Sequence, residues 1–200
     1  MRCVGFGDGF LLKEIVKQAK NRDFLFVTNN LKLLLKFCKE SQIDEFWHFA
    51  CPAGNFENEY SKIYKTFRDT HKIIKFCNKH NIRLVYAGSM GENDCECLDI
   101  YQKFYNCSKY VNTFMIQKES ENCVCLIIPR VYGKNRDKGL IKKLKDNTFN
   151  GSKTSKVEFI DLNDFVSQTL KRIDEVSNTE IYYTTETATI ERIEERYLCS

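Results

Sequence analysis

The sequence is poor in proline and has no long apolar run. Only 2 of its 200 residues are Pro, so it offers little of the rigid turn chemistry that proline provides. No apolar run approaches the length that spans a bilayer, and residues 1–6 lead straight into a glycine turn without a secretory signal. We therefore expect neither a membrane protein nor a secreted one.

An excess of one charge is also lacking. Lys and Arg number 31 against 27 Asp and Glu, a formal net charge of +4, and the charges are spread along the chain. A nucleic-acid binder gathers basic residues into a patch or stripe, so we expect no nucleic-acid partner. Hydrophobic residues at 42% and charged residues at 29% are typical of a soluble globular protein, and the length predicts a single domain over residues 1–200.

Cysteine is abundant, with 10 residues, but the spacing that a disulfide or zinc framework needs is missing. Cys38, Cys77, Cys123 and Cys125 lie in apolar helix or strand patterns, where Cys is usually a small buried hydrophobe. The Cys-Glu-Cys of residues 95–97 has no second Cys or His pair at ligand spacing, so we expect no metal site. Reduced thiols favour a reducing compartment, and we expect a cytoplasmic protein.

Short apolar runs alternate with helical patterns along the whole chain. The expected strands are residues 1–6, 24–27, 46–50, 83–87, 123–128, 157–160 and 181–183. The expected helices are 10–20, 31–39, 59–78, 99–117, 140–144, one capped by Asp161 or Asn163 that runs through 173, and a last one to about 196. This alternation predicts the α/β class, with a Rossmann-like, doubly wound parallel sheet covered on both faces.

Tyr105 and Lys109 form a Tyr-x-x-x-Lys motif in the helix expected at 99–117. Residues four apart share a helix face, so the phenol and the ammonium would point the same way. An adjacent ammonium favours the phenolate, which suits a general acid/base near neutrality. Ser89, just after the strand at 83–87, could hold a substrate oxygen by a hydrogen bond. The alternative is chance spacing, with Tyr105 an ordinary amphipathic-helix residue and Lys109 a solvated one.

A glycine turn follows the first expected strand, where a dinucleotide-binding turn belongs. Gly7 would allow the tight turn, and Gly9 would let the backbone approach a pyrophosphate at the helix N-terminus. Leu12 replaces the third glycine of the fingerprint, and Asp8 adds a negative charge where phosphates would arrive. A plain turn is the alternative.

Two asparagines, Asn29 and Asn30, follow the second expected strand. An NAD site usually places Asp or Glu there to bind the ribose diol. Asn binds a hydroxyl without repelling a 2′-phosphate, and the nearby Lys32 could attract one. NAD and NADP therefore both stay open, as does a simple surface turn.

Six segments that follow one another along the chain match one family pattern. They are the glycine turn at 7–11, the strand end at 48–54, the strand and Ser89 at 85–89, Tyr105 with Lys109, the segment 128–133, and the strand–helix boundary at 158–164. On these segments the chain resembles the extended short-chain dehydrogenase/reductase family, the NAD-dependent epimerases, dehydratases and decarboxylases of nucleotide sugars. The Ala-Cys-Pro-Ala of residues 50–53 is particularly similar to UDP-glucuronate decarboxylases.

The resemblance implies a site and a mechanism. It implies NAD or NADP, bound by Gly7, Gly9, Phe10, Leu11, Asn29, Asn30, Ala50, Cys51, Pro52, Ala87, Tyr105, Lys109 and Pro129. Tyr105 would be the general acid/base on a sugar hydroxyl or ketone, Lys109 would bind the nicotinamide ribose, and Ser89 would orient the reacting oxygen. Ser89 and Arg130 would contact the substrate, and hydride would pass to or from the nicotinamide.

The chain also departs from the family pattern. Arg130 stands where members commonly carry Asn, the segment from Ser89 to Tyr105 is shorter than usual, and 91 residues follow Lys109. The resemblance therefore implies a reduced, vestigial C-terminal substrate lobe that starts at about residue 134.

These features predict an NAD(P)-dependent epimerase/dehydratase-type oxidoreductase that acts on a nucleotide sugar or a similar small carbonyl or alcohol. The alternative is a catalytically inactive scaffold of the same descent, cofactor-binding or cofactor-free, with a structural or regulatory role. As in the family, the helices at about 59–78 and 99–117 could pair into a homodimer. The apolar residues on which this rests, for which an intramolecular core is an equally good account, are Ile63, Phe67, Ile74, Phe104 and Val111.

Overall fold

The structure is a computed structural model of the chain, and it describes residues 1–50, 60–93, 100–133, 136 and 139–198. No helix within these residues is long and apolar enough to cross a membrane.

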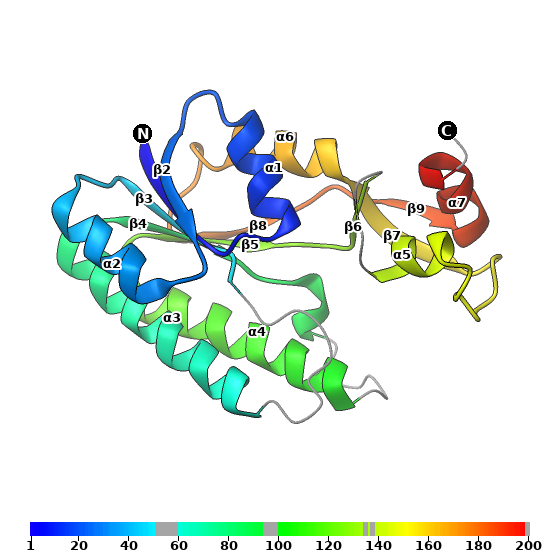
Figure 1. Cartoon of the computed structure of the whole chain (residues 1–200), viewed down its shortest axis with the longest axis horizontal. Helices are drawn as coiled ribbons and strands as arrows, with labels where there is room; N and C mark the ends of the chain where they lie inside the picture. The colour runs from blue at the N-terminus through cyan, green and yellow to red at the C-terminus, as the bar shows by residue number, and fades with distance from the viewer. Residues whose placement is uncertain (51–59, 94–99, 134–135, 137–138, 199–200) are drawn as a thin grey trace.

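A parallel sheet of six strands forms the larger part of the molecule (Figure 1). Its spatial order is β2 (Asp23–Thr28), β1 (Arg2–Phe6), β3 (Glu45–His48), β4 (Arg83–Ala87), β5 (Cys123–Ile127) and β8 (Thr179–Tyr182). Every neighbouring pair is parallel. The interior strands are buried almost throughout because helices cover the sheet on both sides. The expected Rossmann-like fold is confirmed.

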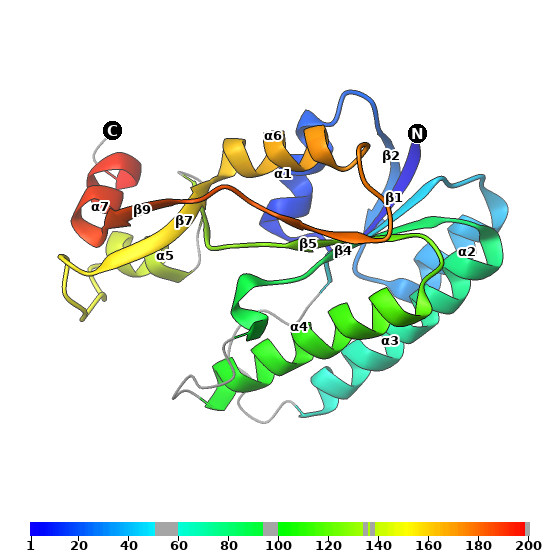
Figure 2. The same ribbon diagram turned by 180° about the vertical axis from the view of Figure 1, so that it is seen from behind.

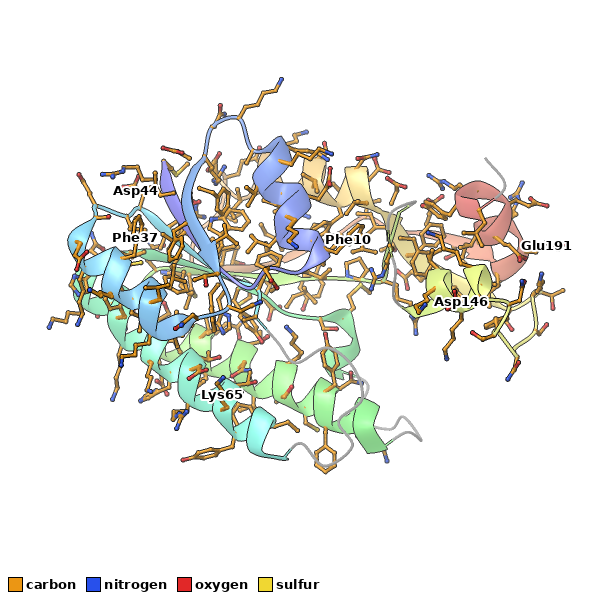
Figure 3. All side chains as sticks on the ribbon, in the orientation of Figure 1. Phe10, Phe37, Asp44, Lys65, Asp146 and Glu191 are labelled. Carbon is orange, nitrogen blue, oxygen red and sulfur yellow. The ribbon has the colours of Figure 1, made fainter. Side chains whose placement is uncertain are left out.

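Helices pack on the two faces of this sheet (Figures 1 and 2). One face carries α1 (Phe10–Gln18) and α6 (Leu162–Arg172), and the other carries α2 (Leu31–Glu40), α3 (Tyr60–His80) and α4 (Ile100–Glu119). Side chains fill the space between the layers, and the partly buried Phe10 and Phe37 each pack against one of the two cores (Figure 3). Asp161 is the cap of α6, since its carboxylate accepts a 2.8 Å hydrogen bond from the backbone N–H of Asn163.

A small lobe lies at one end of the long axis of the molecule (Figure 1). It contains the strands β6 (Val131–Tyr132), β7 (Lys156–Asp161) and β9 (Glu186–Thr189) and the helices α5 (Gly139–Lys145) and α7 (Ile190–Leu198). β6 pairs parallel and β9 antiparallel with β7. The strand expected at 157–160 thus belongs to a second sheet, and β6 and β9 were not predicted. β6 has two residues and β9 is polar, so neither shows an apolar run.

The large sheet ends at β2. The common doubly wound order, 3-2-1-4-5-6, has a further strand outside the second one. Among the described residues, no strand pairs with the outer edge of β2, and residues 24–27 are only half-buried. A register shift between Cys3 and Val4 interrupts the pairing of β1 with β2, and such irregularities make an open edge a poor template for another strand.

Candidate active site

The carboxyl ends of β1, β3 and β4 meet at one edge of the sheet because these neighbouring strands are parallel. Strand order reverses between β1 and β3, and ligands of open α/β sheets bind at such a reversal. Gly7, Ala50 and Ser89 follow the ends of these three strands. The topology therefore brings three of the predicted site segments to one place.

Gly7 sits where the ends of β1 and β3 touch. Its φ is +117°, and a Cβ added there would lie 2.7 Å from the backbone nitrogen of Ala50 and 2.8 Å from the carbonyl carbon of Phe49. The Ala50 N–H donates a 2.7 Å hydrogen bond to the Phe6 carbonyl, which holds the two strand ends together. Only glycine fits this backbone without strain.

Gly9 precedes α1 as its N-cap residue and leaves space beside the helix N-terminus. Because glycine has no side chain, the N-cap residue makes no side-chain hydrogen bond to the first turn. A Cβ added at Gly9 would have no atom of the described residues within 4 Å. A helix N-terminus with open approach to its backbone N–H groups suits an anion such as a pyrophosphate. The turn therefore leaves space for a ligand at the N-terminus of α1.

Leu12 is fully buried in the core beneath α1. A Cβ added at Gly5 of β1 would lie only 2.8 Å from Leu12 Cδ2. The close contact of helix and strand that the third fingerprint glycine normally permits is thus present, with the glycine on the strand instead of the helix. Leu12 points into the core and does not block the glycine turn.

Asn30 has a structural role at the start of α2. Its Oδ1 accepts a 3.1 Å hydrogen bond from the Leu33 N–H, and its own N–H donates to the Thr28 hydroxyl oxygen at 3.1 Å. Asn29 is exposed beside it. The first turn of α2 contains no acidic residue, so no carboxylate there faces a ribose or a 2′-phosphate.

Lys109 is buried at the base of the site, with 4% of its surface exposed. Its Nζ donates a 2.5 Å hydrogen bond to the carbonyl oxygen of Ala87, the last residue of β4. Nζ also lies 5.9 Å from the ring centroid of the half-buried Tyr105 and 5.0 Å from that of Tyr86. The structure thus brings the predicted phenol and ammonium together, and Lys109 is not a solvated residue.

Ser89 lies in the turn that follows β4, ahead of the short 3-10 helix Met90–Asn93. Its hydroxyl oxygen accepts a 3.3 Å hydrogen bond from the Gly91 N–H. A Cβ added at Gly91 would lie 3.6 Å from Ser89 Oγ and 3.1 Å from Asn106 Oδ1. The turn that carries Ser89 therefore rests against Asn106, the residue next to Tyr105 on α4.

His48, at the end of β3, was not among the predicted site residues. It is 1% exposed, and its Nε2 lies 3.0 Å from the Thr70 hydroxyl oxygen. Burial, together with the positive charge of Lys109, lowers the pKa of His48 to about 3. The imidazole is therefore neutral at ordinary pH.

The sequence did hold a signal for this buried polar region. Asn106, Lys109 and Thr113 recur at helical spacing, and all three are buried on the side of α4 that faces the sheet. A polar stripe on a face that packs against a sheet indicates more than core packing, because buried polar groups need partners.

The remaining predicted residues border the same edge. Phe10 packs against the core beneath α1, and its ring lies 3.6 Å from a Cβ placed at Gly133. Leu11 packs on the same core, Pro129 is buried, and Arg130 is exposed at the start of β6. Two predicted cofactor residues, Cys51 and Pro52, lie outside the described residues, as does the Cys-Glu-Cys of residues 95–97.

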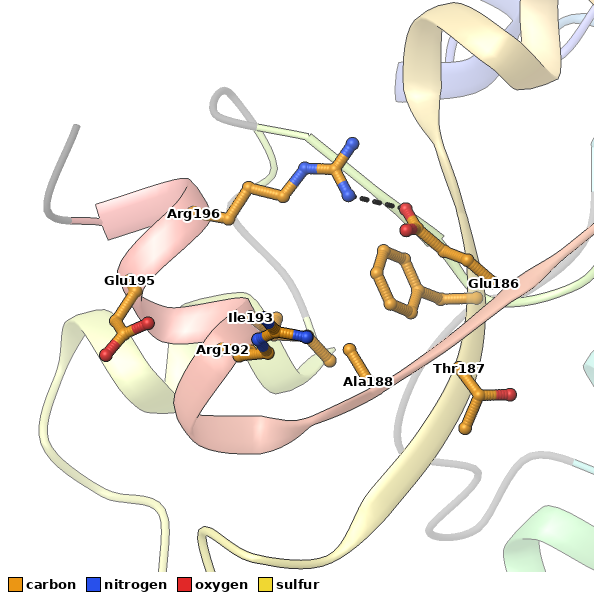
Figure 4. Close-up of a pocket in the computed structure, with 8 residues that line it drawn as sticks. Glu186, Thr187, Ala188, Arg192, Ile193, Glu195 and Arg196 are labelled. Atoms are coloured by element: carbon orange, nitrogen blue, oxygen red, sulfur yellow. Dashed lines mark hydrogen bonds and ion pairs between the residues drawn. The ribbon is translucent and has the colours of Figure 1, made fainter.

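Two cavities lie away from the candidate site. One, of about 450 Å³, is in the small lobe, where Phe159, Ala188 and Ile193 meet charged residues of α7 and a 2.5 Å ion pair joins Arg196 to Glu186 (Figure 4). The other, of about 830 Å³, is an open groove between α6 and the residues around Tyr183. Neither contains Ser89, Tyr105 or Lys109. The candidate site therefore rests on the strand-end backbone and on α4.

Comparisons with known proteins identify a family for most of the chain. The model of the NAD dependent epimerase/dehydratase family matches residues 17–183. The match starts after the glycine turn and includes Ser89, Tyr105 and Lys109. No curated protein matches the chain.

The solved structures that the chain resembles are nucleotide-sugar enzymes and their relatives, at identities that show the fold alone. The Bordetella bronchiseptica enzyme WbmG in complex with NAD has a TM-score of 0.76 at 15% identity, over 100% of this chain and 77% of that one. The UDP-glucose 4-epimerase of Thermotoga maritima, with UDP-glucose, has a TM-score of 0.74 at 12% identity, over 96% and 80%. The GDP-mannoheptose C4 reductase of Campylobacter jejuni, with NADP bound, has a TM-score of 0.68 at 15% identity, over 96% and 82%.

Proposed function

We propose that this chain, which belongs to the NAD dependent epimerase/dehydratase family, is an NAD(P)-dependent enzyme that acts on a nucleotide sugar or a similar carbonyl or alcohol. The observation that carries the proposal is the burial of Lys109 between the end of β4 and the ring of Tyr105. Burying a lysine is costly. A buried ammonium beside a phenol at the carboxyl end of a parallel sheet is the arrangement that this chemistry needs.

The residues have distinct roles in the proposed reaction. Gly7 and Gly9 would hold the pyrophosphate of the cofactor at the N-terminus of α1, and the bound nicotinamide supplies hydride transfer. The Tyr105 hydroxyl exchanges a proton with the substrate oxygen. Lys109 places its positive charge beside the Tyr105 ring, and the Ser89 hydroxyl orients the same substrate oxygen by a hydrogen bond.

Both NAD and NADP fit the residues at the end of β2. WbmG was solved with NAD and the GDP-mannoheptose reductase with NADP. In this chain Asn29 and the acid-free first turn of α2 do not repel a 2′-phosphate. Within the described part of the chain, no strand covers the outer edge of β2, so the adenosine half of the site has one neighbour fewer there. We infer that binding depends more on the pyrophosphate and nicotinamide ends than on the adenosine.

The chain is proposed to work as one unit over residues 1–200, with the small lobe after about residue 134 as a reduced substrate lobe. Arg130 lies exposed where the large sheet leads into β6. Its guanidinium suits the anionic part of a nucleotide-linked substrate. The Thermotoga epimerase was solved with such a substrate, UDP-glucose.

A homodimer through α3 and α4 is part of the proposal. Tyr64, Tyr110, Val111 and Phe114 are exposed on these helices by 69%, 51%, 42% and 52%. These exposed apolar side chains lie on two neighbouring helices, and large exposed apolar surface is typical of an interface. Ile74, also considered for this role, is 1% exposed and belongs to the core. Sedimentation that shows only monomer at high protein concentration would rule the dimer out.

The cysteines support a reducing environment. Six cysteines in the part of the chain that the structure describes are free, and all but one of these are buried: Cys3, Cys38, Cys77, Cys123 and Cys125 are buried, and Cys107 is exposed. Free thiols are usual in the cytoplasm, and we propose that compartment.

A non-catalytic scaffold is the second candidate. Leu12 stands where the third fingerprint glycine belongs, and no strand of the described residues lies outside β2. Both features belong to the cofactor half of the site and favour the scaffold. A scaffold of this kind would have no need of turnover.

Cofactor titration followed by turnover assays separates the candidates. NADH or NADPH at a hundred times its dissociation constant stabilises a protein by about 2.7 kcal/mol, which a melting curve shows readily. Energy transfer from Trp47 to bound NADH gives an independent signal. We expect a melting shift together with conversion of a UDP- or GDP-sugar. A shift without conversion of any nucleotide sugar indicates the cofactor-binding scaffold, and no shift indicates the cofactor-free one.

A further inference from the structure

Three aromatic rings lie in a row beneath the candidate site. Phe6, His48 and Tyr86 are register partners across β1, β3 and β4, at the carboxyl ends of these strands. The ring centroids of Phe6 and His48 are 5.4 Å apart, and those of His48 and Tyr86 are 5.2 Å apart at 63°. All three rings are buried on the face of the sheet that carries α2, α3 and α4. Interiors are close-packed, so the orientation of the Tyr86 ring is fixed by its neighbours.

Lys109 reaches this row from α4. Its ammonium lies 5.0 Å from the centroid of the Tyr86 ring and 5.9 Å from that of Tyr105. A cation within about 6 Å of a ring face is attracted to it, more strongly where water is excluded. Tyr86 is 1% exposed, so its contact with Lys109 is the better desolvated of the two.

We propose that Tyr86 is a positioning residue for the reaction proposed above: its ring face holds the Lys109 ammonium in place beside Tyr105. The inference rests on the proposed function for its catalytic consequence. The four-carbon stem of a lysine is flexible, and the hydrogen bond to Ala87 constrains Nζ along one direction. The ring face of Tyr86 is a further constraint, and it keeps Nζ near the space between the two aromatic side chains.

His48 supports the Tyr86 ring from β3. Its contact with Thr70 of α3 fixes the imidazole, and the imidazole meets the Tyr86 ring at a steep angle. Because His48 is neutral, it adds no second positive charge beside Lys109. The three rings therefore pack beside the ammonium without adding a charge that repels it.

Two substitutions separate a positioning role from simple core packing. Tyr86→Phe keeps the ring face, whereas Tyr86→Leu keeps an apolar side chain and removes the face. Phe46→Leu is the matched control, because Phe46 is fully buried in the same core on the same strand as His48. If Tyr86→Leu does not fold, Tyr86→Met replaces it as the variant without a ring.

The position of Lys109 is read first by NMR, without any substrate. A ring face shifts the resonances of nearby methylene protons upfield, so the Lys109 ε-methylene signal, assigned by its loss in Lys109→Met, reports the contact. We expect the upfield position in the wild type, in Tyr86→Phe and in Phe46→Leu, and its loss in Tyr86→Leu. An unchanged Lys109 signal in Tyr86→Leu would overturn the inference.

The catalytic consequence is read from steady-state kinetics. We expect Tyr86→Leu to lower kcat about tenfold, the size that loss of a desolvated cation–π contact permits, with little change in KM for the sugar substrate. Tyr86→Phe restores kcat to near the wild-type value. Equal losses of kcat in Tyr86→Leu and Phe46→Leu would show a merely structural ring and overturn the catalytic part.

The NMR and kinetic measurements distinguish failure of the proposed function from failure of the role given to Tyr86. If the wild type converts no nucleotide sugar, the proposed function fails, and the NMR comparison alone decides whether Tyr86 holds Lys109. If the wild type is active and Tyr86→Phe loses as much kcat as Tyr86→Leu, the function stands and the positioning role of the ring is wrong.

Discussion

The glycine turn and the buried face of α4 are the two halves of the candidate site, and they are built on different principles. The glycine turn acts through its backbone. The helix carries Leu12 where the family pattern has a glycine, and Gly5 on the strand makes room for the leucine. The α4 half works through side chains, and Tyr105 and Lys109 remain together. A backbone site tolerates substitution when a neighbour restores the packing, whereas a side-chain site has no such freedom.

The largest effect on stability is expected at Gly7, where the backbone leaves no room for a side chain. Gly7→Ala places a Cβ 2.7 Å from the Ala50 nitrogen at a positive φ. Strain and overlap together should cost about 3 kcal/mol or more of folding stability, measured by denaturant unfolding. Cofactor binding should be lost with the shape of the turn.

Gly9→Ala is the matched control on the same turn. Its Cβ meets no atom of the described residues, and its φ of −69° suits any residue. It should cost about 1 kcal/mol or less, as a weaker N-cap, while weakening NAD(P)H binding because the methyl group stands where the pyrophosphate approaches. Equal unfolding free energies for the two variants would contradict the described turn.

The next largest effect is the pH dependence of folding stability that comes from His48, beside the α4 half of the site. The pKa of His48 is lowered to about 3 in the fold, against about 6.5 in the unfolded chain. The unfolded state therefore takes up the proton first, and this contribution to stability is complete above pH 6.5 and is lost as pH falls toward 3. By pH 4.5 the loss should be about 2–3 kcal/mol.

The measurement is urea unfolding from pH 7 to pH 4.5, compared between the wild type, His48→Phe and His71→Gln. His71, whose side chain is 43% exposed beside Glu119, serves as the control. The stability of His48→Phe should fall less steeply with acid than that of the other two. Parallel curves for all three proteins would show that His48 is not buried as described.

The smallest effect tests the exchange within the glycine turn. Gly5→Ala should be destabilising because its Cβ would lie 2.8 Å from Leu12 Cδ2. In a Leu12→Ala background the same change should cost less, and a double-mutant cycle should give a coupling energy of about 1–2 kcal/mol. Additive changes in the unfolding free energy would mean that Gly5 does not accommodate Leu12.

Much of the large sheet could be predicted from the sequence because each interior strand is an apolar run and each helix has one apolar face. The small lobe could not. β9 (Glu186–Thr189) is polar because it lies at the edge of its sheet, and its pairing with β7 spans a long stretch of chain. No local pattern indicates that β7 leaves the large sheet.

The candidate site divides in the same way. The spacing of Tyr105 and Lys109 on one helix face is a local property, and the sequence predicts it correctly. The contact of Lys109 with Tyr86 and its closeness to His48 depend on which strands lie next to each other and on the face that each residue presents. Those are properties of the sheet, and they become visible only when β3, β4 and α4 are placed together.

The central claim is that Tyr105 transfers the proton in a nucleotide-sugar reaction, and Tyr105→Phe tests it most directly. The variant should lose about 10²- to 10⁴-fold in kcat while its dissociation constant for NAD(P)H changes little, because the phenyl ring keeps its place. Tyr110→Phe, on the exposed side of the same helix, should match the wild type in both quantities. Turnover by Tyr105→Phe equal to that of the wild type would contradict the account.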